Sequence, residues 1–244
     1  MNDGPPVVLV GAGGLGREVL SALRAIAGDA PAPVWGFVDD RAETWETSID
    51  DVRVLGPVAA LTDGSLAGCA AVICTGRPGN TRSRVVIDEA LQAAAVPFAT
   101  VVHPTASLAL GTDVGEGSIL LAQVVATAPV TIGRHVVAMP QVVFTHDDLI
   151  GDYTTFGAGV RLAGGVVVEP GAYVGSGALV REHLTIGAGA LVGMGSVVTH
   201  DVPPYEVWAG NPARRLRTLE PPALTSSPRP ADVDTDPPTN GSPR

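Results

Sequence analysis

The first residues that could bind a ligand form a glycine-rich turn, GAGGLG, at positions 11–16. A short apolar run precedes the turn, and an expected helix, 17–26, follows it. Such a turn lets a phosphate approach the backbone and meet the amino-terminal end of a helix. The next expected strand, 34–38, ends in Asp39 and Asp40, whose carboxylates can accept hydrogen bonds from a ribose or a base. The order of strand, glycine turn, helix, strand and acid is that of a dinucleotide fingerprint.

The unit around this turn is short for a complete dinucleotide domain. Residues 52–55 and 70–75 are expected to complete a small sheet, and residues 82–95 to form a second helix. Because the alternation of strands and helices ends near residue 98, we predict a Rossmann-like domain over residues 5–98. Such a domain suits a mononucleotide better than NAD, so no NAD is expected. A glycine turn without a ligand is the alternative interpretation.

The second half of the chain has a period of six residues. Stepping by six from Val114 gives fifteen apolar residues in succession in a chain that is 45% hydrophobic. These residues are Val114, Leu120, Ala126, Ile132, Ala138, Phe144, Ile150, Phe156, Leu162, Val168, Val174, Val180, Ile186, Val192 and Val198. The period predicts a prism of short parallel strands, with one inward side chain per face and eighteen residues per coil.

Glycine often follows the inward residue of a hexad. The glycines in this position are Gly115, Gly133, Gly151, Gly157, Gly175, Gly187 and Gly193. We expect them at corners where the backbone turns tightly or takes a positive φ. A series of β-hairpins is the alternative, and the lack of period-two alternation between polar turns argues against it.

Composition and charge narrow the classes of function. The chain has a net charge of −10, and all 15 basic residues are arginine, so neither nucleic-acid binding nor membrane insertion is expected. No signal peptide or apolar run of transmembrane length is visible, and Cys69 and Cys74 are expected to be core thiols of a cytoplasmic protein. Residues 219–244 are rich in Pro, Ser, Thr and Asp, which predicts a disordered tail.

Four segments make the chain resemble the NeuD/PglD family of sugar acyltransferases. They are GAGGLG with the later FVDD (37–40), VVHPTA (101–106), FTHDDLIGDYTTFGAGVRLAGG (144–165) and VWAGNPARRL (207–216). The last two are specific to acyl-transferring hexapeptide proteins, and the resemblance spans about residues 5–218. It implies a left-handed parallel β-helix over residues 99–218, which forms a homotrimer and binds acetyl-CoA between subunits. It also implies that the amino-terminal domain holds a nucleotide-linked amino sugar.

The resemblance implies roles for particular residues. His146 matches the His–acid dipeptide of the family and is the expected general base, with Asp147 fixing its tautomer. Gly164 comes one coil later, so its amide is expected one rung from His146, where it could stabilise a thioester oxyanion.

The remaining expected contacts fall into two groups. The acetyl-CoA contacts are Thr155, Gly164, Gly210, Asn211, Pro212 and Arg214. The acceptor contacts are Gly11, Gly13, Gly14, Gly16, Asp39, Asp40 and Arg41. In two departures from the family, Leu15 and Thr155 stand where many members have histidine. Of the other histidines, His135 and His183 are expected to be solvated at loop corners.

Other functions can be weighed against acyl transfer to a nucleotide sugar. The zinc carbonic anhydrases share this prism, but they need closely spaced histidines, and no two here are spaced by one turn or by five residues. No metal is therefore expected. A non-catalytic nucleotide-sugar-binding protein would not need the His146–Asp147 pair. Transfer to a natural-product amine or a free sugar hydroxyl stays open. The nucleotide, N- versus O-transfer, the length of the acyl group and the role of the tail also stay open.

Overall fold

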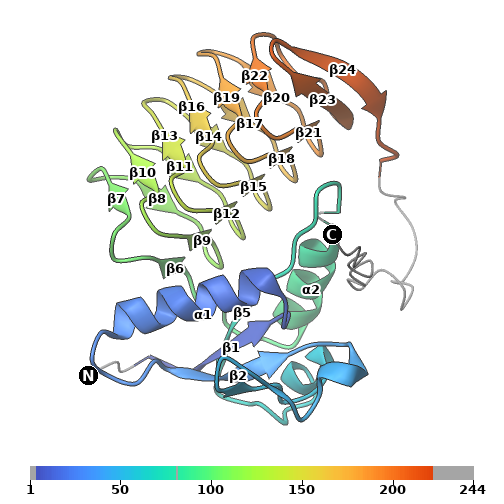
Figure 1. Ribbon diagram of the computed structural model, residues 1–244. Helices are drawn as coiled ribbons and strands as arrows, with labels where there is room; N and C mark the ends of the chain where they lie inside the picture. Colours follow the sequence, from blue (N-terminus) through green and yellow to red (C-terminus); the bar gives the residue numbers. More distant parts are fainter. Residues whose placement is uncertain (1–3, 81, 222–244) are drawn as a thin grey trace, which may run out of the picture.

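The computed structural model describes residues 4–80 and 82–221 (Figure 1). Residues 222–244, which make up most of the predicted disordered tail, lie outside the described residues. A small α/β part at the amino terminus is followed by a long stack of coils that ends in a hairpin (Figure 1). Among the described residues, no helix has the length and apolar character needed to cross a membrane.

The amino-terminal part is built on a three-stranded parallel sheet in the order β2-β1-β5. Its strands are β1 (Val7–Val10), β2 (Val34–Val38) and β5 (Ala70–Ile73). The central strand β1 is buried along its whole length, as expected for an apolar run covered on both faces. The helices are α1 (Gly14–Ala27) and α2 (Arg82–Ala93), so α1 begins three residues earlier than predicted.

The edges of this sheet are less regular than predicted. Strand β4 (Val52–Arg53) pairs antiparallel with β3 (Ser48–Ile49), and only Val54 forms a parallel bridge to β2, at Phe37. Residues 52–55 therefore lie beside the sheet as part of a small hairpin. Two short 3₁₀ helices, η1 (Ala42–Thr44) and η2 (Val58–Leu61), complete this part of the chain.

The coiled part consists of two-residue strands. They are β6 (Val101–Val102), β7 (Ser107–Leu108), β8 (Asp113–Val114), β9 (Ile119–Leu120), β10 (Val125–Ala126), β11 (Thr131–Ile132), β12 (Val137–Ala138), β13 (Val143–Phe144), β14 (Leu149–Ile150), β15 (Thr155–Phe156), β16 (Arg161–Leu162), β17 (Val167–Val168), β18 (Tyr173–Val174), β19 (Leu179–Val180), β20 (Thr185–Ile186), β21 (Leu191–Val192) and β22 (Val197–Val198). From β6 to β19, each strand pairs in parallel with the third strand after it, at an offset of eighteen residues, for example Val125 with Val143. The predicted β-helix with eighteen-residue coils is confirmed.

The three faces of the prism are three parallel sheets. The β7 face runs from β7 to β22, the β8 face from β8 to β20, and the β6 face from β6 to β21. The β6 face continues into an antiparallel hairpin of β23 (Glu206–Gly210) and β24 (Ala213–Thr218), which lies at the far end of the stack (Figure 1). The fifteen residues of the six-residue period point inward, and all are buried except Val114, which is partly buried.

The glycines that follow the inward residues lie at the corners, as predicted, but none of them takes a positive φ. The residues with positive φ stand three places after the inward residue, and they include Asp147 (φ 64°) and His183 (φ 57°) as well as several glycines. The glycine that directly follows the inward residue serves close stacking instead. A Cβ on Gly151 would lie 2.6 Å from the nitrogen of Pro170 in the next coil, so any side chain there would push the coils apart.

The amino-terminal part packs against the outside of the β6 face. Val101, Ile119 and Val137, which precede inward residues on that face, share one apolar cluster with β1 and α1. Helix α1 also lies beside β6, at the start of the stack (Figure 1). Cys69 and Cys74 are both free and buried, as predicted.

Candidate functional site

The corner between β13 and β14 carries a histidine–aspartate pair. Phe144 is the inward residue of this coil, and His146 stands two places after it, at the turn. Its Nδ1 lies 2.8 Å from Oδ2 of Asp147, and both side chains are well exposed, at 64% and 83%. With Nδ1–H donating to the carboxylate, the lone pair of the ring is on Nε2, which can accept a proton from a substrate.

Gly164 lies directly beside the His146 ring, one coil further along the stack. A Cβ at this position would overlap Cε1 and Nε2 of His146, so only glycine lets the imidazole lie against the backbone of the next coil. The neighbouring amide, that of Gly165, donates to the carbonyl of His146 at 2.9 Å. The backbone of Gly164 therefore lies next to the nitrogen that would accept the proton.

A buried carboxylate, not identified from the sequence, supports this corner. Asp148 is fully buried and accepts hydrogen bonds from the amides of Thr145, at 2.8 Å, and Val166, at 2.9 Å. It thus joins the coil of His146 to the coil of Gly164. Burial raises the pKa of Asp148 to about 6, although the two amides act in the opposite direction. The sequence did contain a signal. The position four places after each inward residue, from 118 to 196, holds Ser, Thr, Val, Ala or Leu in all coils except at Asp148, which is therefore the one acid in a series of small or apolar residues.

The glycine turn lies at the carboxyl end of β1. Gly11 takes a φ of 109°, a conformation that side chains disfavour. A Cβ on Gly16 would overlap the carbonyl oxygen of Gly11, so this glycine permits the close approach of helix and turn. Gly13 caps α1, and Gly14 is its first residue. The backbone at this end of the sheet is therefore open to a phosphate.

Asp39, at the end of β2, is only 6% exposed and already has protein partners. Its carboxylate accepts from the amide of Ala12 at 2.8 Å, and from the amide, Nε and Nη2 of Arg41 at 2.9, 2.9 and 3.0 Å. Burial raises the pKa of Asp39, but the bonds from Arg41 and Ala12 outweigh burial and hold it below its usual value. Asp39 therefore links the glycine turn to Arg41. The neighbouring Asp40 is exposed and accepts from the amide of Val58 at 2.9 Å.

The expected acetyl-CoA contacts other than Gly164 lie away from His146 within one chain. Thr155 is on the β6 face, is 7% exposed, and accepts a hydrogen bond from Nη2 of Arg84 at 2.6 Å. Asn211 and Pro212 form the tip of the β23–β24 hairpin, where the amide of Gly210 donates to Oγ of Ser196 at 3.2 Å. The last of these contacts, the arginine at position 214, is exposed on β24.

A buried polar group joins α2 to the corner between the β8 and β6 faces. This junction cluster consists of Arg84 and Asp88 from α2 and Arg134, His135 and Tyr153 from the coils. The carboxylate of Asp88 accepts from the Tyr153 hydroxyl, and its Oδ1 lies 3.4 Å from Nη2 of Arg134. Arg84, which is fully buried, donates to the carbonyl of Tyr153.

The position of His135 corrects a prediction. The sequence predicted a solvated corner, but the His135 side chain is 1% exposed and lies between Phe98, edge-on at 4.6 Å, and Tyr153, stacked at 5.5 Å. Its Nε2 is 3.1 Å from Oδ1 of Asp88. The corner is covered because α2 packs over it. Burial lowers the pKa of His135, and the nearby Asp88 carboxylate opposes this effect.

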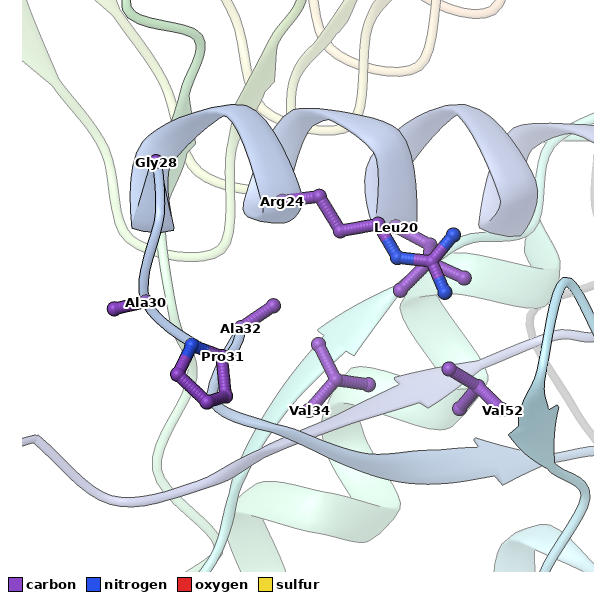
Figure 2. Close-up of a pocket in the computed structure, with 8 residues that line it drawn as sticks. All are labelled: Leu20, Arg24, Gly28, Ala30, Pro31, Ala32, Val34 and Val52. Carbon is purple, nitrogen blue, oxygen red and sulfur yellow. The ribbon is translucent and has the colours of Figure 1, made fainter.

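A separate pocket of about 420 Å³ lies at the carboxyl end of α1 (Figure 2). It is lined by Leu20, Arg24, Gly28, Ala30, Pro31, Ala32, Val34 and Val52. Because it lies at the end of α1 away from the glycine turn, it is not part of the site described above. In the described part of the chain, no group of three or more His, Cys, Asp or Glu side chains could hold a metal ion.

Comparison with known proteins identifies similar enzymes. No protein-family model matches the chain. GDP-perosamine N-acetyltransferase of Escherichia coli O157:H7 is 38% identical over 98 residues, which are 40% of this chain and 44% of the relative. The match thus spans less than half the length of that curated relative.

Three solved structures cover nearly all of the described chain. A histidine-to-asparagine mutant of perosamine N-acetyltransferase from Caulobacter crescentus, in complex with CoA and GDP-perosamine, is 30% identical with a TM-score of 0.79, covering 87% of this chain and 97% of the other. The acetyltransferase domain of PglB from Neisseria gonorrhoeae FA1090, in complex with acetyl coenzyme A, is 27% identical with a TM-score of 0.77, covering 87% and 100%. WeeI from Acinetobacter baumannii AYE is 30% identical with a TM-score of 0.78, covering 86% and 99%.

Proposed function

Because the chain belongs to the family of hexapeptide β-helix sugar acetyltransferases, we propose that it transfers the acetyl group of acetyl-CoA to the amino group of a nucleotide-linked sugar. The single observation that carries this proposal is the His146–Asp147 pair beside the backbone of Gly164. The relatives support the choice of acceptor, since the Caulobacter crescentus enzyme was crystallised with CoA and GDP-perosamine.

The geometry suits general-base catalysis of acyl transfer. The amine nitrogen attacks the thioester carbonyl while Nε2 of His146 accepts its proton, and Asp147 stabilises the resulting imidazolium through Nδ1. The new C–N bond forms and the C–S bond breaks, so CoA departs. The amide of Gly164, one rung from the base, donates to the oxyanion that develops on the carbonyl oxygen.

We assign the acceptor nucleotide to a Rossmann-like domain over residues 5–98 and acetyl-CoA to the left-handed β-helix over residues 99–218. The parallel order β2-β1-β5 and the glycine turn after β1 support the first assignment. In this proposal Gly11, Gly13, Gly14 and Gly16 surround the phosphates. Asp39 acts on the ligand through Arg41 and the Ala12 amide, and Asp40 lies beside them. Two free, buried thiols support a cytoplasmic location.

Replacing Asp39 with alanine should raise the Michaelis constant for the acceptor about tenfold, the scale expected when charge-assisted hydrogen bonds are lost. The constant for acetyl-CoA should not change, because Asp39 contacts no part of the β-helix that we assign to CoA. Steady-state kinetics with each substrate varied in turn measures both constants. Asp29→Ala, an exposed aspartate in the turn after α1, is the matched control. A weakened acetyl-CoA constant with an unchanged acceptor constant would reverse the assignment of the two domains.

We propose that the site is completed by a second subunit of a homotrimer. The amino-terminal part covers the β6 face, whereas His146 lies at the opposite corner of the same prism, between the β7 and β8 faces. One chain therefore holds its acceptor half-site and its base on opposite sides. Leu149 follows that corner on the β8 face and is 52% exposed, and Leu179, two coils further along on the β7 face, is 42% exposed, as expected for surfaces that meet another subunit.

Light scattering at working concentration should give about three times the chain mass of 24.7 kDa. In this arrangement, the hairpin tip at Gly210, Asn211 and Pro212, together with Arg214, would contribute to the acetyl-CoA cleft from a neighbouring chain. Thr155, which is buried against Arg84 of its own chain, would support the cleft only indirectly. A stable monomer with full activity would contradict the trimer.

The proposed reaction can be tested with a panel of acceptors. The protein is incubated with acetyl-CoA and with GDP-, UDP- or dTDP-linked amino sugars, and free thiol release and product mass are followed. Acceptor-dependent thiol release with an acetylated nucleotide sugar is the expected result. Activity only with free amino sugars or other amines would favour the alternative, a non-nucleotide acceptor. No acceptor-dependent release with any amine would support a binding protein.

A further inference from the structure

A second imidazole lies next to the proposed acyl-transfer site. His183 is in the coil that follows Gly164 and Gly165, and its amide donates to the carbonyl of Gly164 at 3.0 Å. A Cβ on Gly165 would lie 2.5 Å from Nδ1 and 3.0 Å from Cε1 of the His183 ring. The ring of His183 thus rests on Gly165, just as the ring of His146 rests on Gly164.

The two rings approach this dipeptide from opposite directions along the stack. His146 belongs to the coil before Gly164 and Gly165, and His183 belongs to the coil after them. Because the Cα atoms of consecutive residues are only about 3.8 Å apart, two exposed imidazoles converge on one short stretch of backbone. The sequence did not suggest this contact, since 37 residues separate the two histidines and the coil has eighteen.

Acyl transfer from a thioester has two proton-transfer requirements, one at the attacking amine and one at the departing sulfur, and this stretch of backbone has a separate imidazole available for each. His146 takes the proton from the attacking amine, while the departing sulfur takes the electron pair of the C–S bond. We propose that His183 is a catalytic residue that protonates this sulfur, an inference that rests on the proposed acetyltransferase function. The C–N bond forms, the C–S bond breaks, and the His183 imidazolium gives its proton to the sulfur, releasing CoA as the free thiol. Exchange with water then restores both histidines, which are exposed.

His183 is well suited to replacement by asparagine. It takes a positive φ of 57°, and asparagine is among the residues that tolerate this conformation. His183→Asn should lower kcat with acetyl-CoA about tenfold, less than the usual range for a general acid because a thiolate is already a fair leaving group. The acceptor Michaelis constant should stay within about twofold of wild type, because His183 is not in the acceptor half-site.

A thioester with an acidic thiol distinguishes protonation of sulfur from a structural role. With S-(4-nitrophenyl) thioacetate as acetyl donor, the leaving thiolate needs no proton, so kcat/KM of the variant should match that of wild type. His103→Asn, in the first coil, is the control and should behave as wild type with both donors. Activity of His183→Asn within about twofold of wild type with acetyl-CoA, or an equal loss with both donors, would overturn the inference. A wild-type protein that releases no thiol with any acceptor would instead overturn the proposed function, so the two failures are distinguishable.

Discussion

Replacement of His146 by alanine should lower kcat by about 100-fold or more, the usual scale for loss of a general base. The side chain is exposed and makes its one described side-chain bond to Asp147, so its removal leaves the coil intact. The affinity for CoA should stay close to wild type, because the imidazole acts on the amine proton and not on the nucleotide of CoA. Initial rates of thiol release measure the first effect, and calorimetry with CoA measures the second.

The control for this variant is His103→Ala, which removes an imidazole from the first coil, away from the β13–β14 corner. It should keep wild-type kcat. If His146→Ala retained activity within about threefold of wild type, another group would have to accept the proton. If it lost CoA binding instead, His146 would be a binding residue and the proposed mechanism would be wrong.

Replacement of Asp88 by alanine should lower the free energy of unfolding by about 2 kcal/mol, the scale expected when donors lose a buried acceptor. Its carboxylate is 1% exposed, and it accepts from the Tyr153 hydroxyl and from Nε2 of Gln92 at 2.8 Å. It is also the acid nearest to Arg134 and His135. Alanine would leave the buried His135 ring and the partly buried Tyr153 hydroxyl and Arg134 guanidinium without this acceptor, which costs more than the bonds themselves contribute.

The adjacent Glu89→Ala provides the matched control, because Glu89 is exposed on the same helix. Its unfolding free energy should change by no more than about 0.5 kcal/mol. Urea unfolding followed by circular dichroism measures both variants. Equal stability of Asp88→Ala and Glu89→Ala would mean that the junction cluster contributes nothing to holding α2 on the coils.

The coils could be predicted from sequence because burial acts on every sixth residue independently of the rest of the fold. Each inward side chain lies on the axis of the prism, so the apolar period and the eighteen-residue coil follow from one requirement. The role of glycines such as Gly151 could not be predicted in this way. A side chain at Gly151 is excluded because the backbone of the next coil, at Pro170, lies too close. This contact arises only when the coils stack.

Tertiary contacts determine the surroundings of His135 and His183, which the sequence alone did not predict. His135 has polar neighbours in the sequence, which predicted a solvated side chain. In the structure α2 covers it, and the residues of α2 are far away in the chain: Asp88 and Arg134, the neighbour of His135, are 46 residues apart. His183 is exposed as expected, yet its contact with Gly165 became visible only once the coils were stacked. Asp39 is a local case: Arg41, two residues later, occupies the carboxylate that the fingerprint had suggested for a ligand.

The hairpin of β23 and β24 has a consequence for how the chains behave in a crowded solution. A stack of parallel strands ends in a row of unpaired backbone groups, which invites a second chain to add its own strands and start a fibre. Here β24 turns back antiparallel on β23, and its exposed side chains include Arg214, Arg215 and Arg217. Charged side chains on the outermost strand discourage such addition. At the start of the stack, α1 lies against β6. The β6 face is thereby closed to end-to-end polymerisation at both ends, although its repeat could in principle continue indefinitely.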